Sequence, residues 1–222
     1  MAWPIYLYVP NLLGYARIIA NVVAFSHCFD QKGMFVTLYF ISFVCDELDG
    51  RFARLLDQRS TFGAVLDMVT DRVSTASLLV VLSSLYSQYF IIFLGLMVLD
   101  ISSHWFQMVS AHLTSKKSHK DVADGTNFLL RIYYRYRPFM GYCCIGAEVL
   151  YLAVYLLHDP SYAAAPLVDL PMIGERSLVE VIAWVALPGC VIKQFVNLVQ
   201  IKTAADVCVT YDMKQDVDKK TQ

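Results

Sequence analysis

The chain has 222 residues, 57% of them hydrophobic, and its 18 basic and 19 acidic side chains leave a formal net charge of −1. Near-neutral charge without a basic, aromatic-rich patch argues against nucleic-acid binding. The hydrophobic share exceeds that of a typical soluble domain and comes in long runs, such as the uncharged stretch from Val73 to Leu99. The composition therefore predicts an all-α, polytopic membrane protein.

The hydrophobic runs predict a bundle of six transmembrane helices within one domain that covers residues 1–222. Residues 1–10 form a segment whose aromatic side chains suit the lipid headgroup region, and Asn11 is expected to cap the first helix. Residues 204–222 are expected to form a cytosolic tail. In chain order, the predicted spans are 11–28, 34–57, 61–86, 89–113, 134–157 and 177–203.

The basic residues orient this bundle. Six spans place both termini on one side, and the loops and helix ends of the opposite side then contain Lys32 and Arg176 as their only basic residues. On the terminal side fall Arg51, Arg54, Arg59, Lys116, Lys117, Lys120, Arg131, Arg135 and Arg137. Because cytosolic loops are enriched in Lys and Arg, we expect both termini to be cytosolic.

The last residues suggest a compartment. Lys219 and Lys220 stand fourth and third from the C-terminal end. This pattern matches the dilysine signal that retrieves membrane proteins to the endoplasmic reticulum, whereas a merely charged, solvated tail is the alternative interpretation. On the first interpretation, we expect a multi-pass protein of the endoplasmic reticulum membrane.

Four aspartates interrupt the apolar sequence of the second and third predicted helices. Asp46 and Asp49 are three residues apart and Asp67 and Asp71 four apart, so each pair shares a helix face. Each carboxylate near a bilayer core costs about 2.5–3.5 kcal/mol on insertion scales, so the four need a counter-charge. Carboxylates without His or Cys suit hard cations such as Mg²⁺ or Mn²⁺, and two such ions would clamp a phosphoryl group.

The residues beside the aspartates bear on what they bind. Gly50 would let a ligand approach the backbone, and Arg54, one turn later, offers a guanidinium for a diphosphate. Asp46 lies roughly 12 Å before the end of its helix, which places the site in the cytosolic leaflet. Two alternatives remain open. The aspartates could form ordinary salt bridges with Arg51, Arg54, Arg59 or Arg72, or they could line the permeation path of a divalent-cation transporter.

The whole motif resembles the signature of the CDP-alcohol phosphotransferase family. It reads Asp46-x-x-Asp49-Gly50-x-x-Ala53-Arg54, then eight residues, then Gly63-x-x-x-Asp67-x-x-x-Asp71. Every fixed position of the family signature is present. Segments 10–17, 103–105 and 130–134 further resemble the eukaryotic phosphatidylinositol synthases within this family.

The resemblance implies a homodimeric enzyme that transfers the phosphatidyl group from CDP-diacylglycerol to myo-inositol and releases CMP. By the same resemblance, Asp46, Asp49 and Asp67 would bind two Mg²⁺ or Mn²⁺ ions. Asp71 would bind the second ion and act as the general base. The residues implied to contact CDP-diacylglycerol are Gly50, Arg54 and Ser60. The signature does not select the acceptor, so glycerol phosphate, serine, choline and ethanolamine remain alternatives to inositol.

Overall fold

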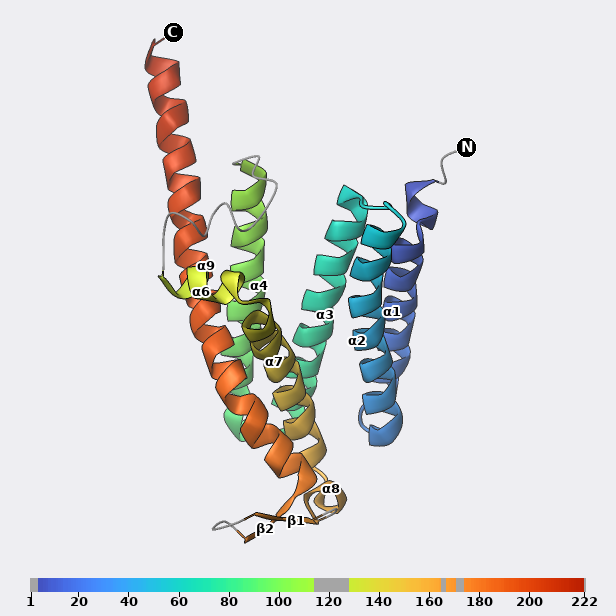
Figure 1. The fold of residues 1–222 in the computed structure, drawn as a ribbon. Coiled ribbons are helices and arrows are strands. Elements are labelled where there is room, and N and C mark those ends of the chain that lie inside the picture. The colour runs from blue at the N-terminus through green and yellow to red at the C-terminus, as the bar shows by residue number, and fades with distance from the viewer. Residues whose placement is uncertain (1–3, 114–127, 165–166, 171–173, 222) are drawn as a thin grey trace. The chain divides into compact units, whose positions relative to one another are not determined.

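The computed structural model describes residues 4–113, 128–164, 167–170 and 174–221 (Figure 1). The first three residues of the predicted headgroup segment lie outside the described residues, as do the predicted cytosolic lysines Lys116, Lys117 and Lys120. The described chain is almost entirely helical, which confirms the predicted fold class. It forms two compact units, Met1–Val81 and Leu82–Gln222.

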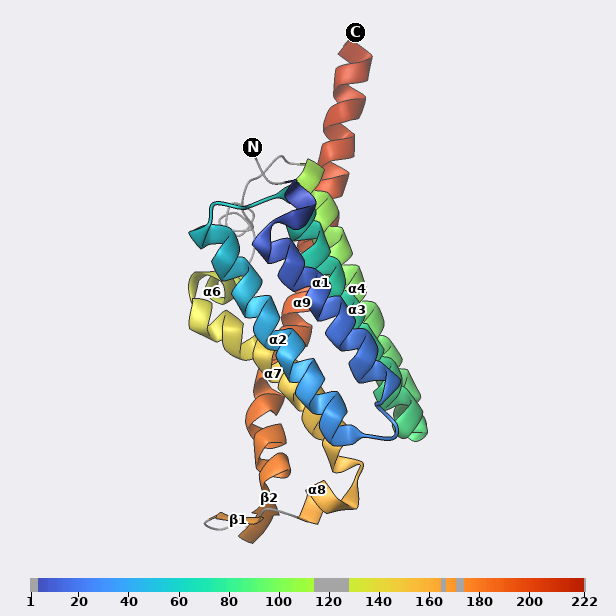
Figure 2. The ribbon, with the colours of Figure 1, turned by 90° about the vertical axis from the view of Figure 1, so that its right-hand side faces the viewer.

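The first unit contains a 3₁₀ turn (Ile5–Leu7), α1 (Val9–Ser26), α2 (Lys32–Leu55) and most of α3 (Thr61–Leu85). Figures 1 and 2 show α1 and α2 side by side. The ring of Phe25 on α1 packs against those of Phe35 and Tyr39 on α2, with centroids 5.2 and 6.0 Å apart. These aromatic contacts join the two helices close to the loop that connects them.

The predicted cap of the first helix is wrong. α1 is preceded by Tyr8 and carries Pro10 in its first turn, where the missing proline N–H leaves no hydrogen bond unmade. Asn11 lies inside the helix and is buried, and its side-chain amide donates to the carbonyl oxygen of Ile5 at 2.5 Å. The asparagine therefore secures the preceding 3₁₀ turn instead of capping α1.

Small residues and short polar contacts bring α3 against α1. A Cβ atom on Gly14 would lie 2.9 Å from the end of the Leu66 side chain, so a larger residue there would require Leu66 to move. Further along, the Asn21 amide donates to the Ser74 hydroxyl at 2.6 Å. The turn before α3 passes through Asp57, whose φ of 51° lies in the left-handed region that Asp tolerates better than most residues.

The second unit is built from α4 (Phe90–Leu113), α6 (Phe128–Arg135), α7 (Arg137–Leu157) and α9 (Leu178–Thr221). Between α7 and α9 lie the short helix α8 (Pro160–Ala164) and strands β1 (Leu167–Leu170) and β2 (Gly174–Ser177), which pair antiparallel. A Cβ atom on Gly146 of α7 would lie 3.1 Å from the Ala186 carbonyl oxygen of α9. Glycine thus permits the close helix contact that small residues commonly mediate in membranes.

Three features of the second unit differ from the prediction. The predicted span 134–157 is two helices, because Tyr136 leaves the helical conformation and Pro138 begins a new first turn in α7. The hairpin formed by β1 and β2 was not foreseen in the linker before the last span. Residues 204–221, predicted as a tail, continue α9 as helix.

The start of α9 is marked by a reciprocal cap. The Ser177 hydroxyl accepts the Glu180 backbone N–H at 3.1 Å, and the Glu180 carboxylate accepts the Ser177 backbone N–H at 3.1 Å. This capping box satisfies two backbone donors that the first helical turn leaves unpaired. Glu180 therefore has a local structural role in the otherwise apolar first turns of α9.

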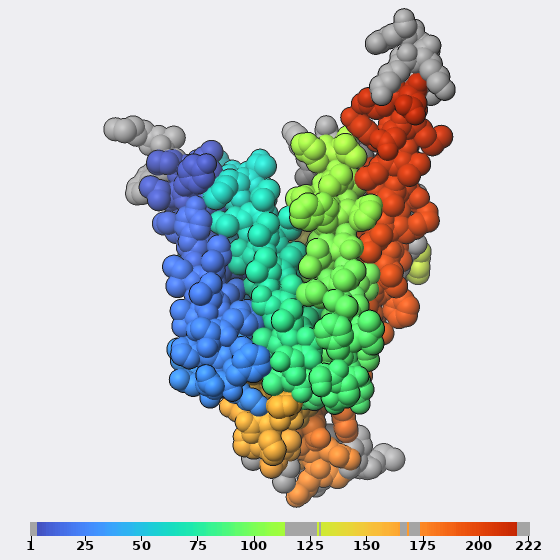
Figure 3. Space-filling model, turned by 180° about the vertical axis from the view of Figure 1, so that it is seen from behind, coloured from blue at the N-terminus to red at the C-terminus, as the bar shows by residue number. Residues whose placement is uncertain are grey.

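Within the described residues, four helical stretches are long and apolar enough to cross a membrane: Val9–Ser26, Ser87–Leu113, Arg137–Leu157 and Leu178–Asp216. Figure 3 shows α4 (green) at the surface of the second unit, where Ile91, Ile92 and Trp105 are more than half exposed. Exposed apolar side chains of this kind suit contact with lipid. The protein is a multi-pass membrane protein, whereas six spans and cytosolic termini stay predictions.

A partly buried tyrosine ties three helices of the second unit together. The Tyr134 hydroxyl oxygen on α6 accepts hydrogen bonds from the Gln107 amide of α4 at 2.6 Å and from the Gln200 amide of α9 at 2.7 Å. Beneath this contact, Leu130, Tyr133, Cys143 and Val196 form a buried apolar cluster. The short helix α6 is thereby anchored by one polar and one apolar contact region.

We predict that Tyr134→Phe destabilises the second unit, because it removes the common acceptor of the partly buried Gln107 amide and the buried Gln200 amide. Leaving buried donors without a partner costs about 1–3 kcal/mol. Thermal unfolding in detergent should show a lower melting temperature. The matched control is Tyr136→Phe, since the Tyr136 side chain is 57% exposed, and this change should leave the melting temperature unaltered. Equal behaviour of the two variants would contradict the anchoring role.

Candidate active site

The four aspartates of the sequence motif meet in the first unit. Asp46 and Asp49 come from α2, and Asp67 and Asp71 come from α3. One carboxylate oxygen from each of Asp46, Asp49 and Asp67 lies within 4.8 Å of the others. The spacing of three and four residues works as expected here, because it turns both members of each pair toward the neighbouring helix.

Arg17 of α1 lies at the centre of this group and is nearly inaccessible, with 3% of its side chain exposed. Its Nη2 atom contacts Asp46 at 2.6 Å and Asp71 at 2.5 Å. Its Nη1 atom contacts Asp67 at 2.9 Å and Asp49 at 3.2 Å. Each terminal nitrogen thus bridges one carboxylate of α2 and one of α3.

The salt bridges considered from the sequence involve other arginines. Arg72 approaches Asp71 at 3.5 Å. Arg51 pairs with Glu47 at 2.8 Å on an exposed face of α2. The closest partner of the motif aspartates therefore comes from the first helix, which the salt-bridge alternative did not consider.

One guanidinium does not balance four carboxylates. With all four ionised, the group with Arg17 retains an excess of three negative charges. The side chains of Asp46, Asp67 and Asp71 remain 30%, 46% and 32% exposed, so a ligand can reach them. A donor set made only of carboxylate oxygens fits Mg²⁺ or Mn²⁺ and does not favour a softer metal ion.

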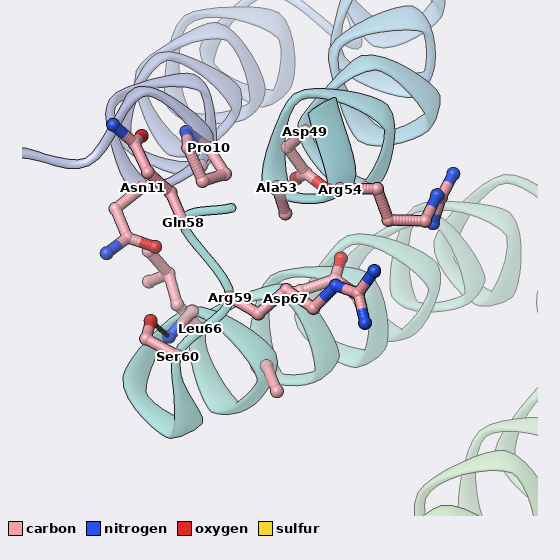
Figure 4. A pocket seen from close by; sticks show the side chains of 14 residues that line it. Pro10, Asn11, Asp49, Ala53, Arg54, Gln58, Arg59, Ser60, Leu66 and Asp67 are labelled. Atoms are coloured by element: carbon pink, nitrogen blue, oxygen red, sulfur yellow. Dashed lines mark hydrogen bonds between the residues drawn. The ribbon is translucent and has the colours of Figure 1, made fainter. Parts of the chain in front are cut away.

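A cavity of about 420 Å³ adjoins the aspartates and is lined by α1, α2, α3 and the loop between the last two (Figure 4). The three residues predicted to contact the nucleotide donor, Gly50, Arg54 and Ser60, all line it. The other lining residues are Pro10, Asn11, Gly14, Asp49, Ala53, Gln58, Arg59, Gly63, Ala64, Leu66 and Asp67. The cavity thus reaches two of the four motif carboxylates.

Of the lining residues Gly50 and Ser60, only Ser60 also has a role in the local structure of the protein. A Cβ atom on Gly50 would meet only the Arg54 guanidinium, at 3.5 Å, so protein packing does not require glycine there. Ser60 accepts the Gly63 backbone N–H at 2.9 Å and so caps the start of α3. Its hydroxyl hydrogen stays available for a ligand, whereas the neighbouring Thr61 is not among the lining residues.

Sequence reasoning missed the contribution of α1. Arg17 and Gln58 were given no role and Asn11 only that of a helix cap, yet Arg17 binds the aspartates and the other two line the cavity. Gln58 also accepts the Val9 backbone N–H at 2.8 Å, which joins the loop after α2 to the start of α1. The available signal was Arg17 itself, since an arginine inside an apolar helix needs an anionic partner.

Comparison with known proteins points to the same family as the aspartate motif. The family model described as CDP-alcohol phosphatidyltransferase matches residues 7–191. The CDP-diacylglycerol–inositol 3-phosphatidyltransferase 1 of Arabidopsis thaliana is 50% identical over 211 residues, which cover 95% of this chain and 92% of that protein. The human CDP-diacylglycerol–inositol 3-phosphatidyltransferase is 36% identical over 216 residues, or 97% and 98% of the two chains.

The protein with the same name from Saccharomyces cerevisiae is 36% identical over 212 residues, which cover 96% of this chain and 90% of that protein. No solved structure gives a significant match. The family match covers most of the chain, and the relatives are similar over nearly their full length. The chain belongs to the CDP-alcohol phosphatidyltransferase family.

Proposed function

We propose that this protein transfers the phosphatidyl group from CDP-diacylglycerol to myo-inositol and releases CMP, forming phosphatidylinositol. The observation that carries the proposal is the convergence of Asp46, Asp49, Asp67 and Asp71 beside the cavity. Family membership supports the reaction type. The names of the relatives from plant, human and yeast support inositol as the acceptor.

The four aspartates would hold two Mg²⁺ or Mn²⁺ ions. Their oxygen-only donor set and partial exposure fit this role. Ions bound there would neutralise the diphosphate and lower the pKa of the acceptor hydroxyl. Asp49, the least exposed of the group at 11%, would complete the ligand set from the inner side.

Asp71 would act as the general base. Its carboxylate takes the proton of an inositol hydroxyl while that oxygen forms a bond to the β-phosphorus of CDP-diacylglycerol. The bond from this phosphorus to the oxygen that links it to CMP breaks, and CMP leaves with the electron pair. Asp71 is partly exposed, so an acceptor hydroxyl can reach it.

The cavity would bind the nucleotide end of the donor. Arg54 offers a guanidinium that can bind diphosphate oxygens in pairs, and the Ser60 hydroxyl can donate a hydrogen bond. Gly50 leaves the backbone of α2 open to the ligand, because only the Arg54 tip lies near its missing side chain. These three residues surround one space, as donor contacts must.

The proposal extends to the domain organisation, the oligomeric state and the membrane location of the enzyme. The family match runs from residue 7 to residue 191 and so includes residues of both compact units, which supports a single functional domain. We further propose a homodimer in the endoplasmic reticulum membrane with the active site facing the cytosol. The basic residues Arg51, Arg54 and Arg59, near the end of α2 and in the loop after it, support that orientation.

An acceptor panel tests the reaction. Detergent-purified protein with CDP-diacylglycerol should convert radiolabelled myo-inositol into lipid-soluble label when Mg²⁺ or Mn²⁺ is present, and chelation should abolish the product. Serine, choline, ethanolamine and glycerol phosphate should give no comparable product. CMP release with one of these alcohols but not with inositol would overturn the acceptor and keep the chemistry.

The role of Asp71 predicts a large loss of activity in Asp71→Asn. Because the amide cannot take the acceptor proton, kcat should fall on the order of 10²–10⁴-fold. The matched control is Glu47→Gln. Glu47 lies on α2, where its exposed carboxylate pairs with Arg51 on an exposed face of the helix, so its loss should leave kcat unchanged. Comparable kcat values for the two variants would exclude Asp71 as the base.

Gly50→Ala separates ligand binding from folding. The new methyl group has room beside the protein atoms, and alanine favours the helix over glycine by about 1 kcal/mol. We therefore expect an unchanged or higher melting temperature together with a KM for CDP-diacylglycerol raised by roughly tenfold, equivalent to about 1.4 kcal/mol. Gly95→Ala on α4, where no atom lies within 4 Å of the new methyl group, is the control and should keep KM. A normal KM in Gly50→Ala would place the donor elsewhere.

A further inference from the structure

Arg17 occupies the position that the proposed function gives to the metal ions. Its two terminal nitrogens lie 2.5–3.2 Å from oxygens of all four motif aspartates. Each nitrogen joins α2 to α3, as a bridging ion would. The guanidinium and the ions therefore have the same ligands.

We propose that Arg17 is an internal counter-cation that divalent ions displace. Without metal ions, the carboxylates bind the guanidinium, and when ions bind, the guanidinium leaves these oxygens. The inference rests on the proposed metal site and adds to it a positioning residue and an order of events. Arg17 does not touch the reacting atoms in this scheme.

The metal-free arrangement follows from electrostatics. Four carboxylates held together in the first unit repel one another, and a buried anion without a partner is strongly destabilising. The Arg17 side chain stays protonated under all ordinary conditions, so it supplies a permanent positive charge. Its contacts keep the aspartates of α2 and α3 facing one another before any ion arrives.

Exchange follows from the short distances within the group. A Mg²⁺ ion needs oxygen ligands at about 2.0–2.1 Å, and one oxygen of each of the four carboxylates already contacts the guanidinium. A divalent ion and the guanidinium bound to the same carboxylates would lie a few ångströms apart and would repel each other strongly. Simultaneous binding is therefore unfavourable, and the ions must take the oxygens from Arg17.

The pairing of Arg17 is also incomplete. Its Nε atom is buried and has no hydrogen-bond partner among the described residues. A purely structural arginine would be expected to use this donor as well, because buried donors left unpaired are destabilising. The incomplete pairing lowers the cost of moving the guanidinium when ions compete for the carboxylates.

Two roles of Arg17, displacement by the ions and support of the bound ions, predict opposite effects of removing Arg17 on metal affinity. If Arg17 must be displaced, its removal should strengthen metal binding, since ions then meet four uncompensated carboxylates. If Arg17 instead stays in place and orients the ligands around bound ions, its removal should weaken metal binding. The direction of the change in affinity therefore distinguishes the two.

The experiment measures Mn²⁺ binding without substrate, from the electron paramagnetic resonance signal of free Mn²⁺ over the full-length protein in detergent. Arg17→Gln should bind Mn²⁺ more tightly than the wild type, on the order of tenfold, because a competing charge is lost. Its melting temperature in chelator should be lower, and saturating Mn²⁺ should raise it more than in the wild type. Asp46→Asn identifies the site, since it should abolish the binding.

Two further variants complete the comparison. Arg51→Gln removes an arginine of α2 that pairs with Glu47, and it should leave Mn²⁺ affinity unchanged. Arg17→Lys retains one positive charge but cannot span four carboxylates as a planar guanidinium does. It should bind Mn²⁺ with an affinity between those of the wild type and Arg17→Gln, and it provides the comparison if the glutamine variant does not fold.

Unchanged or weaker Mn²⁺ binding in the folded Arg17 variants, with normal binding by the wild type, would overturn the exchange and leave the proposed function intact. Absence of Mn²⁺ binding in the wild type and in every Arg17 variant would overturn the exchange together with the metal part of the proposed function. Binding by the Arg17 variants alone would support the exchange in its strongest form.

Discussion

The ion-pair group around Arg17 is the interaction on which the first unit depends. Four carboxylates in two neighbouring apolar helices are unfavourable in each other's presence, and α2 and α3 can face one another there only if positive charge lies between them. In the metal-free protein, Arg17 supplies this charge from α1 and contacts all four. The remaining negative charge is what suits the group to divalent ions.

The same helix also shapes the space beside the carboxylates. Pro10, Asn11 and Gly14 of α1 line the cavity, and Arg17 follows Gly14 by one turn. The close approach of α1 and α3 requires small residues, because a Cβ atom on Gly63 would lie 2.7 Å from the Asn11 side-chain oxygen. α1 thus lines the cavity and also provides the arginine that binds the aspartates. The packing of α1 therefore affects both the cavity and the carboxylate group.

The second unit uses polar residues for a different purpose. Tyr134 accepts hydrogen bonds from two side-chain amides, and the Tyr86 hydroxyl donates to the Val154 carbonyl oxygen at 2.9 Å. Ser177 and Glu180 cap the longest helix. In an apolar surrounding, each such contact satisfies groups that water would otherwise bind, so these residues hold helices together without gathering charge.

The sequence by itself determined the helical membrane fold class, the approximate positions of the helices and the four aspartates as a candidate metal group. Hydrophobic run length and three- and four-residue spacing are properties of neighbouring residues, so they can be read without the fold. The division of the predicted fifth span at Tyr136 and the short hairpin before α9 were not visible in that pattern. Nor was the helical continuation of α9 to Thr221.

Only the tertiary structure decided which cation partners the aspartates. From the sequence, Arg51, Arg54, Arg59 and Arg72 were the natural candidates, because they are near in the chain. Arg17 lies 29 residues before Asp46 in the sequence and meets it only when α1 packs against α2 and α3. The cavity likewise exists only where three helices meet, because its walls come from segments that no local pattern brings together.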